Sequence, residues 1–212
     1  MAWLQQGEVV ALAYLLGSVP TGYLVARARG IDIRSVGSGN IGATNVFRIL
    51  GKRAGAFVLL ADALKGALAV LLLPRWLGGE AADERMQAAL VAGVCAVLGH
   101  NFTCWLRFKG GKGIATSAGV LAAWAPWPFL ATLGVFGAVL AASRYVSLAS
   151  IVAAAALPLA QAFLPPRNRS LVIISGVLSA LAIFRHHGNI RRLLAGTERR
   201  IGRAGKPGKE TS

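Results

Sequence analysis

Long apolar stretches, separated by short polar segments, run through most of the chain. A helix needs about 20 apolar residues to cross the hydrocarbon core of a bilayer. Stretches of this kind lie at about residues 9–28, 54–73, 88–106, 146–164 and 170–184. Residues 114–143 are also apolar but are interrupted by a Trp-Ala-Pro-Trp-Pro run at 124–128, so we expect two shorter helices there. The pattern therefore predicts an all-α integral membrane protein with about seven transmembrane helices, some of them short or broken.

Two prolines and two charged residues modify this pattern. Pro20 interrupts the first stretch and predicts a kink, and Pro74 is expected to end the second. Asp62 and Lys65 lie inside the second stretch, three positions apart and therefore on one helix face. A charged group within a bilayer is costly unless it is paired inside the protein, so these residues predict a structural ion pair.

The composition supports a membrane protein, since 55% of the residues are hydrophobic and the mean hydropathy is +0.59. Lysine and arginine outnumber aspartate and glutamate by 23 to 8. With seven spans, 18 of the basic residues fall on one side of the membrane, 4 fall on the other, and Lys65 lies within a span. The positive-inside rule places the larger group in the cytoplasm, with the N-terminus outside and the C-terminus inside. Nucleic-acid binding is not expected, because the basic residues adjoin the spans.

A polar, glycine-rich segment at residues 34–53 is the first candidate for chemistry. Glycines let a backbone turn tightly and bring N–H groups to a ligand, while hydroxyl, amide and guanidinium groups donate to phosphate. The segment therefore predicts an anion-binding cradle that ends on a helix N-terminus. An ordinary polar loop with a capped helix is the alternative interpretation. The candidate ligands are Gly37, Ser38, Gly39, Asn40, Thr44, Asn45 and Arg48.

Two further polar segments fall on the same predicted side of the membrane. The RFKGGKG loop at residues 107–113 combines mobile backbone with positive charge, and it carries Lys109, Gly110, Gly111 and Lys112. The C-terminal RHHGNIRRLLAGTE at residues 185–198 places His186 and Asn189 on one helix face. Independent surface loops need not share a side, so the three segments predict one composite site facing the cytoplasm.

The residue types at this site limit its chemistry. N–H donors and cations are plentiful, while the sequence offers neither a carboxylate pair for acid–base work nor a cluster with metal-ligand spacing. We therefore expect no metal and no cofactor, a structural role for Glu198, and inert thiols at Cys95 and Cys104. A transporter of a phosphorylated metabolite is the main alternative. A lipid phosphotransferase is disfavoured because it needs acidic metal ligands.

Four segments together resemble a known family: GSVPTGYLVARARGIDIRSVGSGNIGATNVFRILGKRAG, GHNFTCWLRFKGGKGIATSAGV, RYVSLAS and RHHGNIRRLLAGTE. They follow the order found in the bacterial acyl-phosphate-dependent glycerol-3-phosphate acyltransferases, and the resemblance covers nearly the whole chain. It implies a seven-helix enzyme of the bacterial inner membrane with a cytoplasmic active site. It also implies transfer of a fatty acyl group from acyl phosphate to the 1-hydroxyl of glycerol 3-phosphate. The products would be lysophosphatidic acid and inorganic phosphate, in the first acylation of phospholipid biosynthesis.

The resemblance also implies roles for individual residues. The glycine-rich segment with Ser38, Asn40 and Thr44 resembles the pocket for the acyl-phosphate head. The group that holds glycerol 3-phosphate in the family is matched by Arg48, Lys112, His186 and Asn189, with Ser150 in reach of the same site. His187 and Gly188 stand where the family often has a basic and an acidic residue, which leaves the role of His187 open.

Transfer is expected to be direct, with Ser38 as a ligand and not as an acylated nucleophile, because no triad-like spacing accompanies it. The proton acceptor stays open between His186 and a substrate phosphate oxygen. The expected partners are acyl phosphate and glycerol 3-phosphate, as substrates, and membrane lipid. A soluble enzyme that makes acyl phosphate is a further candidate partner. The chain is expected to be a monomer. One membrane-embedded domain is expected over residues 1–202, with a disordered basic tail at 203–212. The lack of a basic residue before Arg27 argues against a cleaved signal peptide.

Overall fold

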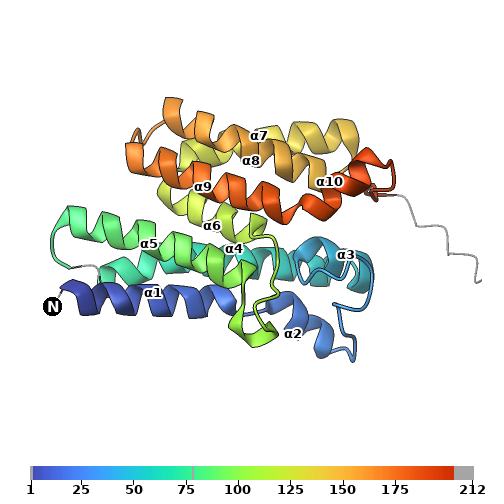
Figure 1. Ribbon diagram of the computed structural model, residues 1–212, viewed down its shortest axis with the longest axis horizontal. Helices are drawn as coiled ribbons and strands as arrows, with labels where there is room; N and C mark the ends of the chain where they lie inside the picture. The colour runs from blue at the N-terminus through green and yellow to red at the C-terminus, as the bar shows by residue number, and fades with distance from the viewer. Residues whose placement is uncertain (1, 78, 203–212) are drawn as a thin grey trace, which may run out of the picture.

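The computed structural model describes residues 2–77 and 79–202, with side chains from residue 6 onward. Over these residues it contains ten α-helices, one short 3-10 helix and no strand, which confirms the all-α prediction (Figure 1). In chain order they are α1 (Ala2–Ser18), α2 (Thr21–Arg27), α3 (Ala43–Leu50), α4 (Lys52–Leu77), α5 (Ala82–Asn101), η1 (Cys104–Leu106), α6 (Ile114–Trp124), α7 (Pro126–Ser143), α8 (Val146–Phe163), α9 (Arg169–Arg185) and α10 (His187–Leu194).

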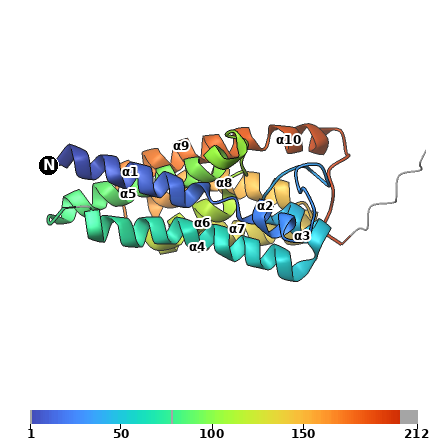
Figure 2. The same cartoon turned by 90° about the horizontal axis from the view of Figure 1, so that it is seen from below.

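The helices form an elongated bundle in which the long helices run along one common direction (Figures 1 and 2). α1, α4 and α5 contact one another on one side, α7, α8 and α9 form the other side, and α6 packs on α4 between them. The short helices α2, α3 and α10 gather at one end, opposite the N-terminus. That end carries the polar segments that the sequence singles out.

Five helical segments over the described residues are long and apolar enough to cross a membrane. A sixth is added if α9 and α10, which are bent by 56°, count as one span. α6 has only 11 residues, and its break from α7 falls at Ala125, inside the Trp-Ala-Pro-Trp-Pro run. The count of seven spans and their orientation stay predictions.

Several helix ends differ from those expected. The first apolar stretch is broken at residues 19–20, so that α1 and α2 together make one candidate span. The expectation that Pro74 ends the second span is wrong, because α4 continues to Leu77 with Pro74 inside its last turns. A proline within a helix removes the one hydrogen bond from its own position to the carbonyl four residues earlier, and α4 continues for three residues after Pro74. α5 runs from Ala82 to Asn101, which shifts it toward the N-terminus relative to the predicted span at 88–106.

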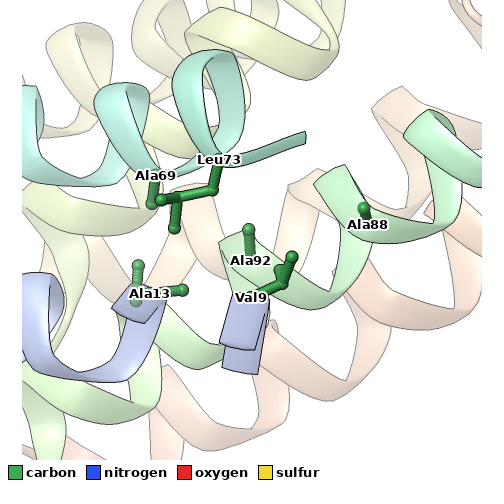
Figure 3. Packing of buried hydrophobic residues seen from close by; sticks show 7 residues of the cluster. Val9, Ala13, Ala69, Leu73, Ala88 and Ala92 are labelled. Atoms are coloured by element: carbon green, nitrogen blue, oxygen red, sulfur yellow. The ribbon is translucent and has the colours of Figure 1, made fainter. Parts of the chain in front are cut away.

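Small side chains bring α1, α4 and α5 close together. In lipid, association by burying apolar area is weak, and close backbone approach supplies the contact instead. A Cβ on Gly17 of α1 would collide with the backbone of Ala96 on α5. The buried cluster consists of Val9, Ala13, Ala69, Leu73, Ala88, Ala92 and Ala96 (Figure 3). Larger apolar side chains such as Leu60 and Phe163 are 68% and 71% exposed, which suits a surface in contact with bilayer.

A buried polar cluster lies between α4 and α5. The Lys65 ammonium is 2.9 Å from Asp62 Oδ1 and 3.0 Å from His100 Nδ1, and it donates to the carbonyl of Val19 at 2.9 Å. The predicted ion pair is therefore confirmed, and His100 extends it. The described helices pack as one bundle, and the predicted tail at 203–212 lies outside the described residues.

Candidate active site

The glycine-rich loop before α3 is organised around the side chain of Asn45. Its Oδ1 accepts a hydrogen bond from the Ser38 N–H at 2.9 Å. Its Nδ2 donates to the carbonyls of Ile33, Val36 and Asn40 at 3.2, 3.1 and 3.0 Å. The loop is thus wound around one buried amide, while Ser38 itself stays exposed at the surface of the loop.

This arrangement gives Asn45 a different role from the predicted substrate contact, because its amide is already used inside the loop. Gly37 serves the same purpose, since its φ is +64° and a Cβ there would collide with Asn45 Oδ1. The Ser38 N–H is occupied as well. Backbone donors for an anion come instead from the first turn of α3, where Ala43 and Thr44 precede the first intrahelical hydrogen bond.

The RFKGGKG loop is held from beneath, which corrects the expectation of a mobile backbone. The Gly110 N–H donates to the carbonyl of Asn101 at 3.1 Å, and the Gly111 N–H donates to that of His100 at 3.0 Å. The carbonyls of both glycines accept hydrogen bonds from the Arg185 guanidinium at 2.7–3.1 Å. A Cβ on either glycine would collide with the end of α5. The two glycines therefore position the loop and do not offer their N–H groups to a ligand.

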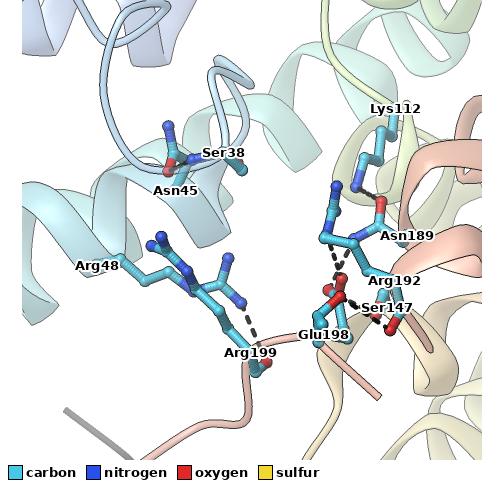
Figure 4. A network of polar contacts seen from close by, with 10 residues as sticks. Ser38, Asn45, Arg48, Lys112, Ser147, Asn189, Arg192, Glu198 and Arg199 are labelled. Atoms are coloured by element: carbon cyan, nitrogen blue, oxygen red, sulfur yellow. Dashed lines mark hydrogen bonds and ion pairs between the residues drawn. The ribbon is translucent and has the colours of Figure 1, made fainter. Parts of the chain in front are cut away.

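A network centred on Glu198 joins the RFKGGKG loop to α8 and α10 (Figure 4). The carboxylate accepts hydrogen bonds from Ser147 at 2.9 Å, Asn189 at 2.8 Å and Arg192 at 2.7 Å. Burial acts to raise the pKa of Glu198, but these hydrogen bonds outweigh it and hold the pKa below its usual value. Lys112 Nζ donates in turn to Asn189 Oδ1. The structural role predicted for Glu198, including its pairing with an arginine, is confirmed.

His186 and Ser150 are both buried and both donate to backbone. His186 Nδ1 lies 2.7 Å from the carbonyl of Ala182, and a carbonyl only accepts, so Nδ1 carries the hydrogen. In the neutral ring this leaves Nε2 as the acceptor. The Ser150 hydroxyl donates to the carbonyl of Val146 at 2.8 Å.

These elements enclose a polar cavity of about 140 Å³. The predicted residues on its wall are Ser38, Asn40, Thr44, Asn45, Arg48, Lys112, Ser150, His186 and Asn189. The structure thus brings together the three segments of the predicted composite site. The remaining candidates lie off the wall: Gly37, Gly39, Gly110 and Gly111 shape the loops, and Lys109 is exposed.

A larger, mainly apolar groove of about 1380 Å³ adjoins the polar cavity. α3 and α4 line one side of it and α7 and the start of α8 line the other, through Phe47, Leu59, Phe136 and Leu140. Thr44 and Arg48 line both the groove and the polar cavity. The junction therefore suits a ligand with a long hydrocarbon chain and an anionic head.

Arg48 and Lys112 are the cations on the wall of the polar cavity, and the two carboxylates on that wall, Asp62 and Glu198, are paired with Lys65 and Arg192. Burial lowers the pKa of the Lys112 ammonium to about 8, with Glu198 opposing the shift and Arg192, Arg48 and Arg185 adding to it. Burial also lowers the pKa of the Arg48 guanidinium. Cations crowded in this way are stabilised by a bound anion.

Sequence reasoning did not assign five supporting residues to the site: Arg185, Arg192, Ser147, His100 and Asp62, the last of which is expected only in an ion pair. The last three line the polar cavity, while the two arginines fix the RFKGGKG loop and Glu198. Four of them lie inside the quoted motifs, which is the signal in the sequence that could have suggested a role, whereas Asp62 lies outside these motifs. No group of three or more His, Cys, Asp or Glu residues in the described chain is arranged to hold a metal ion.

The fold and the site define a helical integral membrane protein with a polar cavity that adjoins an apolar groove. The glycerol-3-phosphate acyltransferase family model matches residues 8–196. The glycerol-3-phosphate acyltransferase of Geotalea daltonii is 50% identical over 195 residues, which cover 90% of this chain and 96% of that protein. The protein of the same name from Geobacter sulfurreducens is 49% identical over 193 residues, covering 91% of this chain and 96% of that protein.

A solved structure is also similar. The crystal structure of PlsY (YgiH), an integral membrane glycerol 3-phosphate acyltransferase, in its glycerol 3-phosphate form is 40% identical, with a TM-score of 0.84 over 93% of this chain and 96% of that one. This chain therefore belongs to the glycerol-3-phosphate acyltransferase family of membrane enzymes. The predicted family is confirmed, and the transporter and phosphotransferase alternatives are set aside.

Proposed function

We propose that this chain transfers a fatty acyl group from acyl phosphate to the 1-hydroxyl of glycerol 3-phosphate, without a metal or cofactor. The observation that carries the proposal is the junction at Thr44 and Arg48 between the polar cavity, which holds Lys112, and the apolar groove. The similar PlsY structure, described in a glycerol 3-phosphate form and a lysophosphatidic acid form, supports it. The reaction gives lysophosphatidic acid and inorganic phosphate and begins phospholipid biosynthesis.

Glycerol 3-phosphate binds in the polar cavity. Lys112, Arg48 and His186 surround it, and Asn189 is held in place by Glu198 at 2.8 Å. Because Glu198 is neutralised by Arg192, it leaves the charge of Lys112 available to a phosphate. The phosphate replaces Asn189 as the partner of the ammonium.

Acyl phosphate places its chain in the apolar groove and its head at the loop before α3. There the Ser38 hydroxyl, the Asn40 amide and the N–H groups at the start of α3 are donors for the phosphate and for the oxyanion that develops on the carbonyl. Arg48 lines both the groove and the polar cavity, so its guanidinium lies between the two substrate phosphates and offsets their charge.

The chemical step is a direct acyl transfer. The 1-hydroxyl oxygen attacks the acyl carbonyl, the bond from that carbon to the phosphate oxygen breaks, and inorganic phosphate leaves with the electron pair. We assign the hydroxyl proton to a phosphate oxygen of a bound substrate, because burial, with the charges of Lys112 and Arg185 added, lowers the pKa of His186 to about 4. The mixed anhydride is already activated, so positioning two repelling anions is the main task, and such positioning supplies about 7–11 kcal/mol of a barrier.

We also propose a cellular location and partners for the enzyme. The α3 and α10 end, which carries most of the positive charge, faces the cytoplasm of a bacterial inner membrane. The chain acts as a monomer and meets an acyl phosphate made by a soluble enzyme. Glycerol 3-phosphate then enters the polar cavity from the cytoplasm.

Isotope exchange separates direct transfer from an acylated Ser38. Purified protein is incubated with palmitoyl phosphate and labelled inorganic phosphate, without glycerol 3-phosphate. Direct transfer predicts no label in palmitoyl phosphate, whereas an acyl-enzyme would return the acyl group to labelled phosphate.

Ser38→Ala and Arg48→Ala are expected to abolish transfer. Lys109→Ala, which lies outside both cavities, is expected to retain it. Near-normal transfer by Ser38→Ala would defeat the assignment.

A further inference from the structure

The segment at residues 196–202 follows α10 and lines the apolar groove. Its residues after Gly196 lie beyond the family match, and Arg199 lies beyond the motif that ends at Glu198. Three contacts fix it to the rest of the molecule. Glu198 is buried in its network, the Arg200 guanidinium lies 4.9 Å from the centroid of the Tyr145 ring, and the Ile201 N–H donates to the carbonyl of Arg144 at 2.8 Å. The segment is therefore a fixed wall of the groove.

Arg199 adds a second arginine to the wall of the groove that Arg48 lines. The Arg48 guanidinium contacts the backbone of Arg199, with Nη2 3.5 Å from the Arg199 carbonyl oxygen (Figure 4). Burial lowers the pKa of the Arg48 guanidinium, and the positive charge of Arg199 lowers it further. Of the ion pairs among the described residues, none includes either arginine, because Glu198 is paired with Arg192. Both arginines line the groove, and each guanidinium offers N–H donors that suit a phosphate.

The cations divide between the two cavities. Lys112 lines only the polar cavity, Arg199 and Arg200 line only the groove, and Arg48 lines both. Two phosphorylated substrates need separate cationic positions, since their phosphates repel each other. The division matches one anion in the polar cavity and a second at the head of the groove.

We propose that Arg199 holds, together with Arg48, the phosphate of the acyl donor whose chain lies in the groove, while Arg200 on Tyr145 keeps the segment in place. This rests on the proposed function, because that function supplies a donor with a long chain and a terminal phosphate. Arg199 is then a specificity residue for the acyl donor and is indifferent to glycerol 3-phosphate.

The test uses hexadecyl phosphate, which has the chain and the phosphate of the donor but cannot transfer an acyl group. Full-length protein in detergent is titrated separately with hexadecyl phosphate, neutral 1-hexadecanol and glycerol 3-phosphate, and binding is measured from the ligand-induced rise in unfolding temperature. In Arg199→Gln the affinity for hexadecyl phosphate should fall about tenfold, as expected for one charge-assisted contact. Affinity for the other two ligands should not change. Arg199→Lys should recover part of the loss, and Arg191→Gln, an exposed arginine outside both cavities, should match the wild type.

Three outcomes would overturn the inference: no hexadecyl phosphate binding by the wild type, equal losses for hexadecyl phosphate and glycerol 3-phosphate, or the same loss in Arg191→Gln. The donor assignment is tested separately by turnover. If hexadecyl phosphate binds in an Arg199-dependent way but palmitoyl phosphate is not used, the proposed function fails and the anion position at Arg199 stands. If palmitoyl phosphate is used equally well by Arg199→Gln, the inference fails and the proposed function stands.

Discussion

Lys112 links the electrostatics of the site to its pH dependence. Its pKa is lowered from 10.5 to about 8, so in the free enzyme the ammonium loses its charge as the pH rises through about 8. The charged form binds phosphate, and kcat/KM for glycerol 3-phosphate should therefore fall above that pH. A lysine at its ordinary pKa would keep its charge for about two more pH units. Bound phosphate stabilises the charge, so kcat should fall at a higher pH than kcat/KM.

Lys112→Arg provides the control, because a guanidinium keeps its charge throughout the accessible range. The alkaline fall in kcat/KM should move upward in this variant even if the absolute rate is lower. A fall that stays near pH 8 in Lys112→Arg would assign it to another group.

Asn45 gives a second prediction at the residue scale. Asn45→Asp keeps the shape but replaces the Nδ2 donor by an oxygen that faces three backbone carbonyls. Losing buried partners in this way costs about 1–3 kcal/mol, and the loop that carries Ser38 should unwind. Thermal unfolding should show a lower midpoint and the transfer rate should be lost. Full activity at a normal midpoint would show that the loop does not depend on this amide.

At this scale the sequence predicts that Ser38, Arg48 and Lys112 belong to one site, and all three line the polar cavity. The sequence does not separate side chains that face the cavity from side chains that hold the loops in shape. Asn45 and Gly110 lie in the same motifs as the ligands, but their hydrogen bonds turn inward to backbone groups. That distinction depends on the loop conformation, which the residue types alone do not specify.

Among the elements, α6 is held against α4 by backbone contact. A Cβ on Gly119 would collide with the carbonyl of Ala63, and one on Gly66 would collide with that of Thr116. Gly119→Val should push the two helices apart, at a cost of about 1–3 kcal/mol, and displace Lys112 just before α6. The unfolding temperature and the affinity for glycerol 3-phosphate should both fall.

Gly134→Val on α7 is the matched control, because a Cβ at Gly134 meets nothing within 4 Å. It should leave unfolding and affinity unchanged. Equal effects of the two substitutions would contradict the role given to the α4–α6 contact.

The apolar pattern predicts the existence of the long helices because each needs a continuous apolar stretch. It predicts their ends less well, as α4 and α5 show. Pro74 lies inside α4, and α5 begins with the charged turn that includes Asp83 and Glu84. Helices that project beyond the hydrocarbon core continue through polar residues, so hydropathy alone misses the last turn of α4 and the first turns of α5.

For the molecule as a whole, the charge distribution predicts which end faces the cytoplasm. In a variant with Cys95 and Cys104 replaced by alanine, Lys109→Cys should react with a membrane-impermeant maleimide only after the membrane is opened. Arg167→Cys, in the turn between α8 and α9 at the other end, should react in intact spheroplasts. The reverse labelling pattern would invert the proposed topology.

The composite site could be predicted at this scale because three motifs share one predicted side of the membrane. The apolar groove could not, since it forms where α3 and α4 face α7 and α8, which are far apart in sequence. Its walls consist of ordinary apolar residues such as Leu59 and Phe136, and these look the same as residues that face lipid. Only helix packing makes them a binding surface.

The most direct test of the account is a single assay with two products. Purified protein is mixed with palmitoyl phosphate and labelled glycerol 3-phosphate, without metal or coenzyme A, and phosphate release and labelled lipid are followed together. The account predicts equal amounts of inorganic phosphate and labelled lysophosphatidic acid, both lost in Arg48→Ala. Phosphate release without labelled lipid, or labelled lipid that requires coenzyme A or a metal, would contradict it.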